Sequence, residues 1–183
     1  YFLDIGLPET YELAQTELPA VERRRVVFFD RDGTLTKDDG YTHRLADLAW
    51  LPGAVAAVRG LNDAGRLVIV VTNQAGIARG YFTEANMRTF HQEMQRQLQI
   101  EGAHIDGFFH CPHHPDGAVD GLSIQCNCRK PGTGLLEQAR MAFRIDLNDA
   151  VMIGDKQSDI EAARAFGIRG LLTAGRPLTD LTR

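Results

Sequence analysis

The sequence is poor in cysteine, carries no excess of positive charge and contains no long hydrophobic run. Its longest aliphatic stretch, residues 67–71, is far shorter than the roughly 20 residues needed to cross a bilayer, so no membrane contact is expected. The net charge of −4 gives no general attraction to nucleic acid or to anionic membranes. Any site for a phosphorylated ligand must therefore be a local cluster of cations.

The amino-terminal residues also lack the pattern of a secretory signal, because they carry Asp4, Glu9 and Glu12 without a basic stretch before them. All three cysteines fall between residues 111 and 128. An odd, clustered set of this kind indicates metal binding in a reducing compartment rather than a disulfide framework. The expected location is the cytoplasm.

Short apolar runs alternate with helical patterns from about residue 25 onward, which predicts a Rossmann-like α/β fold with a parallel sheet and helices on both faces. The apolar runs predict strands over residues 26–29, 68–71, 105–109, 151–153 and 170–173. Amphipathic spacing predicts helices over residues 54–64, from Thr83 to Gly102, over 135–143, and from a Ser158–Glu161 capping box to Phe166.

Three polar residues are expected to follow directly on predicted strands. These residues are Asp30, Thr72 and Asp155. Parallel strands place their carboxyl ends at one edge of the sheet, where α/β folds bind ligands. The sequence therefore predicts one crevice assembled from three distant parts of the chain.

The segment DRDGTL at residues 30–35 carries the strongest chemical signal. Enzymes accelerate phosphate-monoester hydrolysis by up to about 10²¹-fold, of which general acid–base catalysis supplies only about 10²–10⁴. A carboxylate nucleophile divides the reaction into two easier displacements. We expect Asp30 to be that nucleophile and Asp32 to protonate the leaving oxygen. A calcium loop is excluded, because Thr34 and Tyr41 stand where carboxylate or amide ligands would be needed.

A magnesium ion is expected at the same place. Magnesium prefers oxygen ligands and keeps several waters, so one or two carboxylates suffice. We expect Asp30 and Asp155 as ligands, with the backbone carbonyl of Asp32, and we expect Asp159 to be a neighbouring helix-terminal charge. Lys130 would supply the fixed cation that phosphoryl transfer requires.

The second strong signal is a group of four zinc ligands in two short motifs. Three thiolates and one imidazole form a closed tetrahedral site with no position for water, so the zinc is expected to be structural. The expected ligands are Cys111, His113, Cys126 and Cys128, with His110 and His114 as alternatives that spacing does not exclude. Arg129 and Lys130 follow the last cysteine directly, so zinc would fix the loop that carries both cations. By contrast, His91-Gln92-Glu93 opens like a zinc-deaminase signature but lacks its cysteines, and is expected on a helix surface.

Together these motifs resemble the haloacid-dehalogenase superfamily and, within it, the D-glycero-D-manno-heptose-1,7-bisphosphate phosphatases. The resemblance covers FDRDGT (29–34), DGY (39–41), VTNQAGIARG (71–80), CPHHP (111–115), CNCRKP (126–131) and GDK (154–156). It implies that Thr72 and Lys130 stabilise the phosphoryl group and that Arg129 recognises substrate. It also implies further substrate contacts by Asp38, Asp39, Gly40, Tyr41, Asn73, Gln74, Ala75 and Lys156.

The resemblance further implies a phosphatase domain over residues 23–183 without a large cap domain, and with a zinc-binding loop insert at 110–130. The expected reaction removes the anomeric phosphate of a heptose bisphosphate, a small phosphorylated sugar. Residues 1–22 resemble the end of a sugar nucleotidyltransferase, which implies a covalent fusion to such a domain. Two alternatives are a histidinol-phosphate phosphatase and a zinc-stabilised binding module with a dead active site. The intact acidic residues argue against the second.

Overall fold

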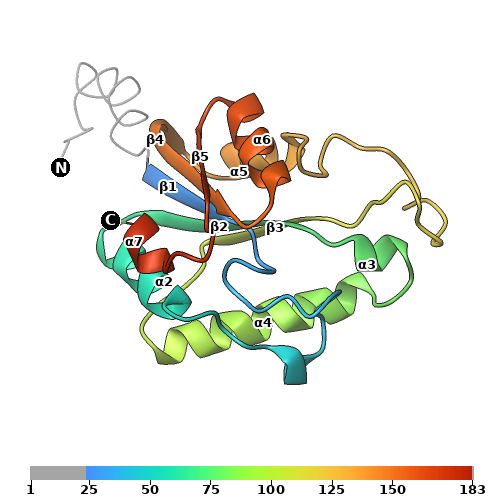
Figure 1. The fold of residues 1–183 in the computed structure, drawn as a ribbon, viewed down its shortest axis with the longest axis horizontal. Coiled ribbons are helices and arrows are strands. Elements are labelled where there is room, and N and C mark those ends of the chain that lie inside the picture. Colours follow the sequence, from blue (N-terminus) through green and yellow to red (C-terminus); the bar gives the residue numbers. More distant parts are fainter. Residues whose placement is uncertain (1–23, 183) are drawn as a thin grey trace, which may run out of the picture.

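The computed structural model describes residues 24–182, and the tail expected over residues 1–22 lies outside this range. Five parallel strands form one sheet in the order β3-β2-β1-β4-β5 (Figure 1). The strands are β1 (Arg24–Phe29), β2 (Leu67–Asn73), β3 (Gly107–Cys111), β4 (Ile145–Gly154) and β5 (Arg169–Leu172).

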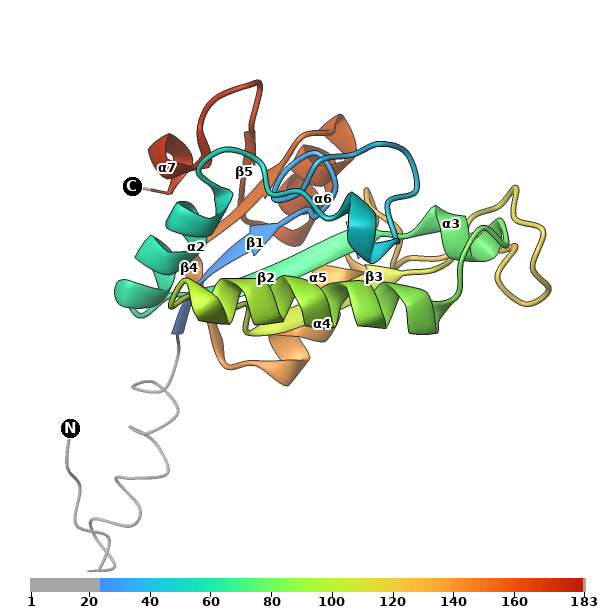
Figure 2. The same ribbon diagram turned by 90° about the horizontal axis from the view of Figure 1, so that it is seen from below.

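Helices cover both faces of this sheet, as the two perpendicular views show (Figures 1 and 2). One face packs against α2 (Ala54–Asp63), α4 (Glu84–Ile100) and α7 (Leu178–Leu181). The other packs against α5 (Gly134–Ala142) and α6 (Gln157–Phe166). The short helices η1 (Leu45–Asp47) and α3 (Ala75–Ala78) lie in the connections between the larger elements. The Rossmann-like α/β fold is confirmed, and the described part of the chain contains no large cap domain.

Alternation along β1 explains the two-layer core. Val27 and Phe29 join the apolar cluster under α2 and α4, while Val26 and Phe28 join the cluster under α5 and α6. Successive side chains of a strand point to opposite faces, so an unbroken apolar run is what a doubly covered strand requires. Within residues 24–182, no helix is both long enough and apolar enough to span a membrane.

Several element boundaries differ from those expected. β4 begins at Ile145 instead of Val151, because Arg24 and Arg25 of β1 pair with Ile145 and Asp146, before the register between the two strands shifts. Its start, IDLND, has no apolar run that would have revealed a strand. The predicted third strand is displaced by two residues and becomes Gly107–Cys111.

Two further boundaries bear directly on the crevice. β2 continues to Asn73, so Thr72 lies inside the strand and does not follow it. The helix α6 begins at Gln157, and the backbone N–H of Lys156 donates to Asp159 Oδ2 at 3.0 Å. The expected capping box of Ser158 and Glu161 is therefore wrong, because the helix starts earlier.

Strand order places a topological switch point at the centre of the sheet. From β1 the chain builds outward through β2 and β3 on one side, and later through β4 and β5 on the other. Connections that leave in opposite directions open a crevice at the carboxyl ends of the two diverging strands. Asp30 follows β1 and Asp155 follows β4, so the fold brings both acids to this crevice.

The packing of α4 yields the first prediction. Met94 is fully buried in the core cluster, whereas Met141 of α5 is 86% exposed. Met94→Ala should lower the free energy of unfolding by about 2–5 kcal/mol, through lost burial and a residual cavity. The matched Met141→Ala exchange should change it by less than about 0.5 kcal/mol. Urea unfolding followed by circular dichroism measures both, and similar effects of the two variants would contradict the assigned core.

Candidate active site and zinc centre

Three carboxylates meet at the carboxyl edge of the sheet. Carboxylate oxygens of Asp30, Asp155 and Asp159 all lie within 4.8 Å of one another. Two glycines permit this approach, because a side chain at Gly33 would collide with Asp155 and one at Gly154 would collide with Asp159. Gly33 also has a φ of 78°, which favours glycine in the turn after Asp32. Asp159 thus lies in the first turn of α6, as the expected helix-terminal charge, and is also a member of the acidic cluster.

Lys130 is the cation of this cluster. Its ammonium lies 2.9 Å from Asp30 Oδ1 and 2.7 Å from Asp159 Oδ1, and it donates to the carbonyl of Val71 at 2.7 Å. The residue is buried together with both of its acidic partners. Such a lysine cannot move far, so its charge is fixed beside the proposed nucleophile as expected.

The acidic cluster fits a magnesium ion. Asp155 Oδ1 is buried without a hydrogen-bond partner, which leaves an oxygen free for a cation. Burial, with repulsion from Asp30 and Asp159, raises the pKa of Asp155 to about 6 against the opposing effect of Lys156. A divalent cation stabilises the ionised form of such a carboxylate, which is costly to form without a positive charge nearby. A role for the Asp32 backbone carbonyl as a ligand stays a prediction.

Beside the cluster, Asp32 and Thr72 share one hydrogen-bond partner. Gln74 Nε2 donates to Asp32 Oδ2 at 2.9 Å and to Thr72 Oγ1 at 2.8 Å. Gln74 is buried, and burial also raises the pKa of Asp32 above its usual range. Gln74, an expected substrate contact, therefore also holds the side chains of Asp32 and Thr72 in place.

A cavity of about 390 Å³ opens beside Asp30, Asp32 and Lys130. Its lining includes most of the expected site residues: Asp30, Asp32, Asp38, Gly40, Tyr41, Asn73, Gln74, Ala75, Arg129, Lys130 and Lys156. Three expected residues are outside this lining: Thr72, Asp155 and Asp39. The carboxylate of Asp39 lies 2.8 Å from Lys37 Nζ. The expectation had omitted Arg79 and His114, which also line the cavity; Arg79 stands in the VTNQAGIARG motif that supplied its neighbours.

Asn73 joins the end of β2 to the loop that carries Lys130. Its side-chain amide donates to the carbonyl of Lys130 and accepts from the Lys130 backbone N–H, both at 3.0 Å. With this pair satisfied, the side chain of Asn73 positions Lys130, and its role as a substrate contact stays a prediction.

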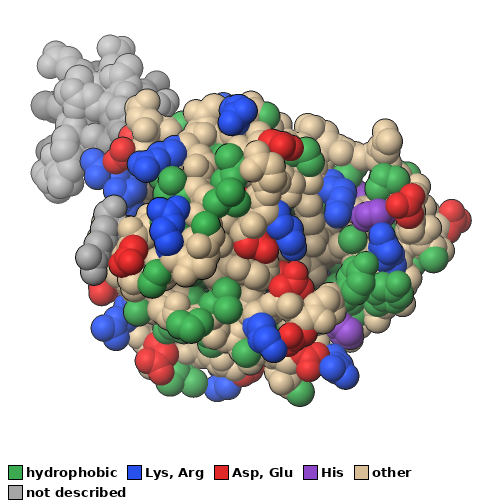
Figure 3. Space-filling view, in the orientation of Figure 1, with side chains coloured by type: hydrophobic (Ala, Val, Ile, Leu, Met, Phe, Trp, Pro, Cys, Tyr) green, Lys and Arg blue, Asp and Glu red, His purple; other side chains and the backbone are tan. Residues whose placement is uncertain are grey.

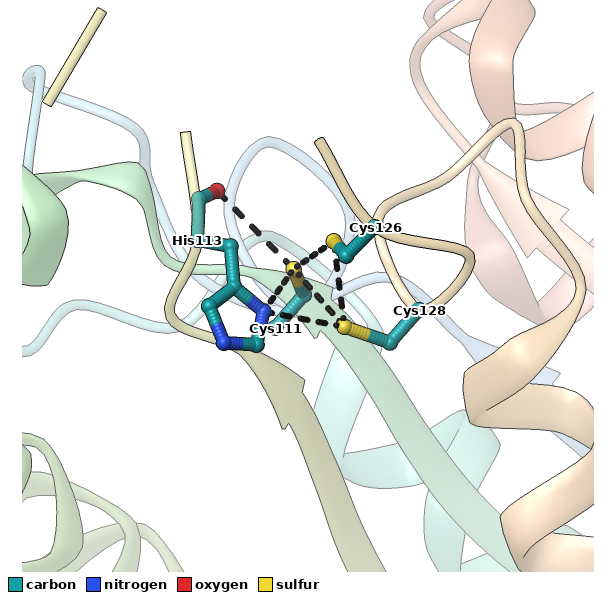
Figure 4. Close-up of side chains that lie close together, drawn as sticks. All are labelled: Cys111, His113, Cys126 and Cys128. Atoms are coloured by element: carbon teal, nitrogen blue, oxygen red, sulfur yellow. Dashed lines mark hydrogen bonds between the residues drawn. The ribbon is translucent and has the colours of Figure 1, made fainter. Parts of the chain in front are cut away.

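The four expected zinc ligands converge in space (Figure 4). The sulfur of Cys128 lies 3.2 Å from that of Cys111, 3.3 Å from that of Cys126 and 3.2 Å from Nδ1 of His113. Zn–S bonds of about 2.3 Å in a tetrahedron would place sulfurs about 3.8 Å apart, slightly wider than here. This closed set of soft donors is compatible with a structural zinc site.

The two alternative histidines lie outside this cluster. His110 Nε2 is 3.6 Å from Glu84 Oε2, and His114 Nδ1 accepts a hydrogen bond from the backbone of Asp116. The loop that carries the ligands projects at the right of Figure 1 beside α3, where Ala78 O accepts from the backbone of residues 118 and 119.

His91 corrects the expectation of an exposed helix surface. It is 6% exposed, contacts Arg31 and stacks on Phe108. The spacing of its neighbours could have predicted this burial. Residues three and four apart share one face of a helix, and the apolar Met87 and Met94 lie at those distances from His91. The apolar stripe of α4 therefore includes this histidine.

A family model described as HAD-hydrolase-like matches residues 127–175. This match, the switch-point crevice and its acidic cluster point to the class, a HAD-like hydrolase with a site suited to a divalent cation.

Two relatives extend the similarity over most of the chain. The D-glycero-beta-D-manno-heptose-1,7-bisphosphate 7-phosphatase of Rhodopseudomonas palustris is 41% identical over 156 residues, covering 85% of this chain and 87% of the relative. The D-glycero-alpha-D-manno-heptose-1,7-bisphosphate 7-phosphatase of Photorhabdus laumondii is 39% identical over 160 residues, covering 86% and 87%.

A solved structure agrees with both relatives. D,D-heptose 1,7-bisphosphate phosphatase from B. bronchiseptica, complexed with magnesium and phosphate, superposes with a TM-score of 0.72. It is 34% identical, and the match covers 81% of this chain and 79% of that one. The chain belongs to the heptose-bisphosphate phosphatase family of HAD-like hydrolases.

The names of these relatives differ from the expected reaction in one respect. The two relatives are named 7-phosphatases, so the phosphate that they release is the one at carbon 7 and not the anomeric one. The expectation rested on a single reactive pocket, which shows that one phosphate reacts at a time. Such a pocket does not determine which end of the sugar enters it.

The zinc cluster yields the second prediction. We expect purified protein to hold one zinc ion per chain and Cys128→Ser to lose it, because structural zinc contributes about 10–16 kcal/mol of apparent binding energy. Activity should fall with it, since Lys130 stands two residues beyond Cys128. Elemental analysis measures the zinc, and His110→Asn, outside the cluster, should keep it. Zinc-free wild-type protein with an ordered loop would contradict this assignment.

The acidic cluster yields the third prediction. A proton and a magnesium ion compete for Asp155, whose pKa is about 6 without metal. Above pH 7 the carboxylate is ionised and magnesium affinity should be nearly constant. Below pH 6 the affinity should fall by up to about tenfold per pH unit, as one linked proton requires. Calorimetric titration with MgCl₂ between pH 5 and 8 tests this, and equal affinity at pH 5 and pH 7 would contradict it.

Proposed function

We propose that this protein hydrolyses the phosphate at carbon 7 of D-glycero-D-manno-heptose 1,7-bisphosphate through an aspartyl-phosphate on Asp30. The observation that carries the proposal is the contact of Asp30 with Lys130 inside the acidic cluster, at the base of the cavity. The names of the relatives supply the substrate class and the position of the phosphate.

The side chains support a division of roles in the reaction. Asp30 attacks phosphorus while the bond to the sugar oxygen breaks, and Asp32 protonates that oxygen. Lys130 and the hydroxyl of Thr72 would stabilise the charge on the transferring group. Asp30, Asp155 and Asp159 would hold magnesium, which supplies positive charge to the phosphate when bound. Water then cleaves the aspartyl-phosphate, with Asp32 accepting its proton.

Cations in the lining of the cavity support binding of the retained phosphate. Arg79 Nε and Arg129 Nη1 are buried without hydrogen-bond partners, and both residues line the cavity. Planar guanidinium groups bind phosphate through paired hydrogen bonds. Lys156, 3.3 Å from Asp38, is a third cation in the lining of the cavity. These groups suit the anomeric phosphate of a bound sugar whose other end reaches Asp30.

The expected cellular location and binding partners of the protein are also part of this proposal. Three reduced cysteines support a cytoplasmic location. On the face shown in Figure 3, basic and acidic side chains are interspersed, which does not favour nucleic-acid binding. A phosphatase domain starting near residue 23, and a covalent fusion of the tail at 1–22 to a sugar nucleotidyltransferase domain, remain proposals from sequence resemblance.

A substrate panel is the fourth prediction and tests the function. With magnesium, kcat/KM should be higher for a heptose 1,7-bisphosphate than for histidinol phosphate, and phosphorus NMR should show a product that keeps its anomeric phosphate. Asp30→Asn should lower kcat by about 10⁴-fold or more, because an amide is no nucleophile here. Asp32→Asn should cost about 10²–10⁴.

Each part of the assignment has its own contradicting result. Faster turnover of histidinol phosphate would overturn the substrate. A 7-phosphate product would overturn the position of the reacting phosphate. Near-normal rates in folded Asp30→Asn protein would overturn the aspartyl-phosphate mechanism.

A further inference from the structure

Arg31, between the two catalytic aspartates in sequence, is completely buried. Its Nε donates to Asp32 Oδ1 at 2.8 Å and its Nη2 to Asp32 Oδ2 at 2.9 Å. Paired bonds of this kind between guanidinium and carboxylate fix both the distance and the plane of the acid. Asp32 lines the cavity, whereas Arg31 does not. A fully buried guanidinium therefore holds a carboxylate that is accessible to substrate.

Contacts on every side immobilise the guanidinium. Nη2 also donates to the carbonyl of Thr42 at 2.7 Å and to Gln74 Oε1 at 3.1 Å. The charged carbon lies 4.7 Å from the centre of the Phe90 ring. Gln74 donates in turn to Asp32, so these three polar side chains form a closed ring of hydrogen bonds.

The remaining nitrogen, Nη1, lies 3.2 Å from Nε2 of His91, sixty residues along the chain. Arginine has no lone pair to offer, so it donates and His91 Nε2 accepts. Burial, with the nearby Arg31 charge, lowers the pKa of His91 to about 2, which keeps the ring neutral and able to accept. The ring is held by α4 and stacks on Phe108 of β3 with centroids 4.4 Å apart.

We propose that Arg31 and His91 are positioning residues, which hold the Asp32 carboxyl group in line with the oxygen of the departing sugar. The proposal rests on the proposed function, in which Asp30 forms a bond to phosphorus, the bond to the sugar oxygen breaks, and a proton passes from Asp32 to that oxygen. His91 reaches neither substrate nor metal and acts through Arg31. If its acceptor is lost, Nη1 is left unpaired in the interior, and the guanidinium must turn away from its paired contacts with Asp32.

Substrates with different leaving groups can distinguish this positioning role from a general effect on folding. A sugar alkoxide is a poor leaving group and needs the proton from Asp32, whereas 4-nitrophenolate leaves without one. The ratio kcat/KM reports steps up to the first irreversible one, here the transfer to Asp30. A displaced Asp32 should therefore impair transfer from a sugar phosphate much more than transfer from 4-nitrophenyl phosphate.

The experiment compares His91→Asn with His91→Gln, two amides that differ by one methylene. The Gln amide reaches the position of Nε2 and keeps an acceptor for Arg31, whereas the Asn amide does not. His91→Asn should lower kcat/KM for the heptose bisphosphate by about 10-fold or more, a part of the 10²–10⁴ that an acid supplies. It should lower kcat/KM for 4-nitrophenyl phosphate by less than about threefold, and His91→Gln should restore most of the loss.

Leu98→Ala is the matched control for destabilisation of α4, because Leu98 is buried in the same helix about two turns beyond His91, and it should leave the ratio between the two substrates unchanged. Equal losses of His91→Asn on both substrates, or no rescue by His91→Gln, would overturn the proposal. If His91→Asn does not fold, His91→Leu gives the same comparison with an apolar side chain. Should the unmodified protein prefer histidinol phosphate, the substrate assignment fails alone, and that alkyl phosphate replaces the heptose in the comparison.

Discussion

Three carboxylates lie within 4.8 Å of one another at the carboxyl edge of the sheet, and the site is organised around their mutual repulsion. Two like charges 4 Å apart repel by about 4 kcal/mol even at an effective dielectric constant of 20. Lys130 offsets part of this cost by contact with Asp30 and Asp159. A divalent cation would offset the rest of the repulsion between the carboxylates. The same charge arrangement therefore favours binding of a metal ion together with a phosphate.

The position of Lys130 depends on two attachments outside the acidic cluster. Asn73 holds its backbone to the end of β2. On the preceding side, Cys128 ties the loop to Cys111 at the end of β3 through the zinc-ligand cluster. Since β2 and β3 pair in parallel, both attachments reach the same sheet edge. A metal that takes no part in the reaction would thereby fix the charge that does.

The proton-transfer side of the site is built differently, from hydrogen bonds within the protein interior. Asp32 receives three, from Arg31 and Gln74, and the buried guanidinium is itself held from α4 by His91. Buried polar groups of this kind are stable only when each has its partner, so the network has few alternative arrangements. Asp30, the proposed nucleophile, is thus held by a balance of charges, whereas Asp32, the proposed acid, is held by a rigid hydrogen-bond network.

The amino-acid sequence by itself determined the parts of this protein that depend on neighbours along the chain. The strand before Asp30 and the glycine turn after Asp32 could be predicted because they depend on adjacent residues. The cluster of three cysteines and His113 could also be predicted, although spacing left His110 and His114 as alternatives that only the fold separates from it. Strand boundaries that depend on pairing with another strand could not be predicted in this way. For example, β4 begins earlier than its apolar run because its largely polar first residues pair with the start of β1.

Only the tertiary structure decided the contacts between distant segments. Asp159 is part of the acidic cluster because the first turn of α6 places it there. The side-chain amides of Asn73 and Gln74 form hydrogen bonds with other protein groups. His91 became a partner of Arg31 because α4 packs its buried stripe against the sheet. The apolar period of that helix showed which residues are buried. It did not show what a buried imidazole would meet, because that partner comes from another element sixty residues away.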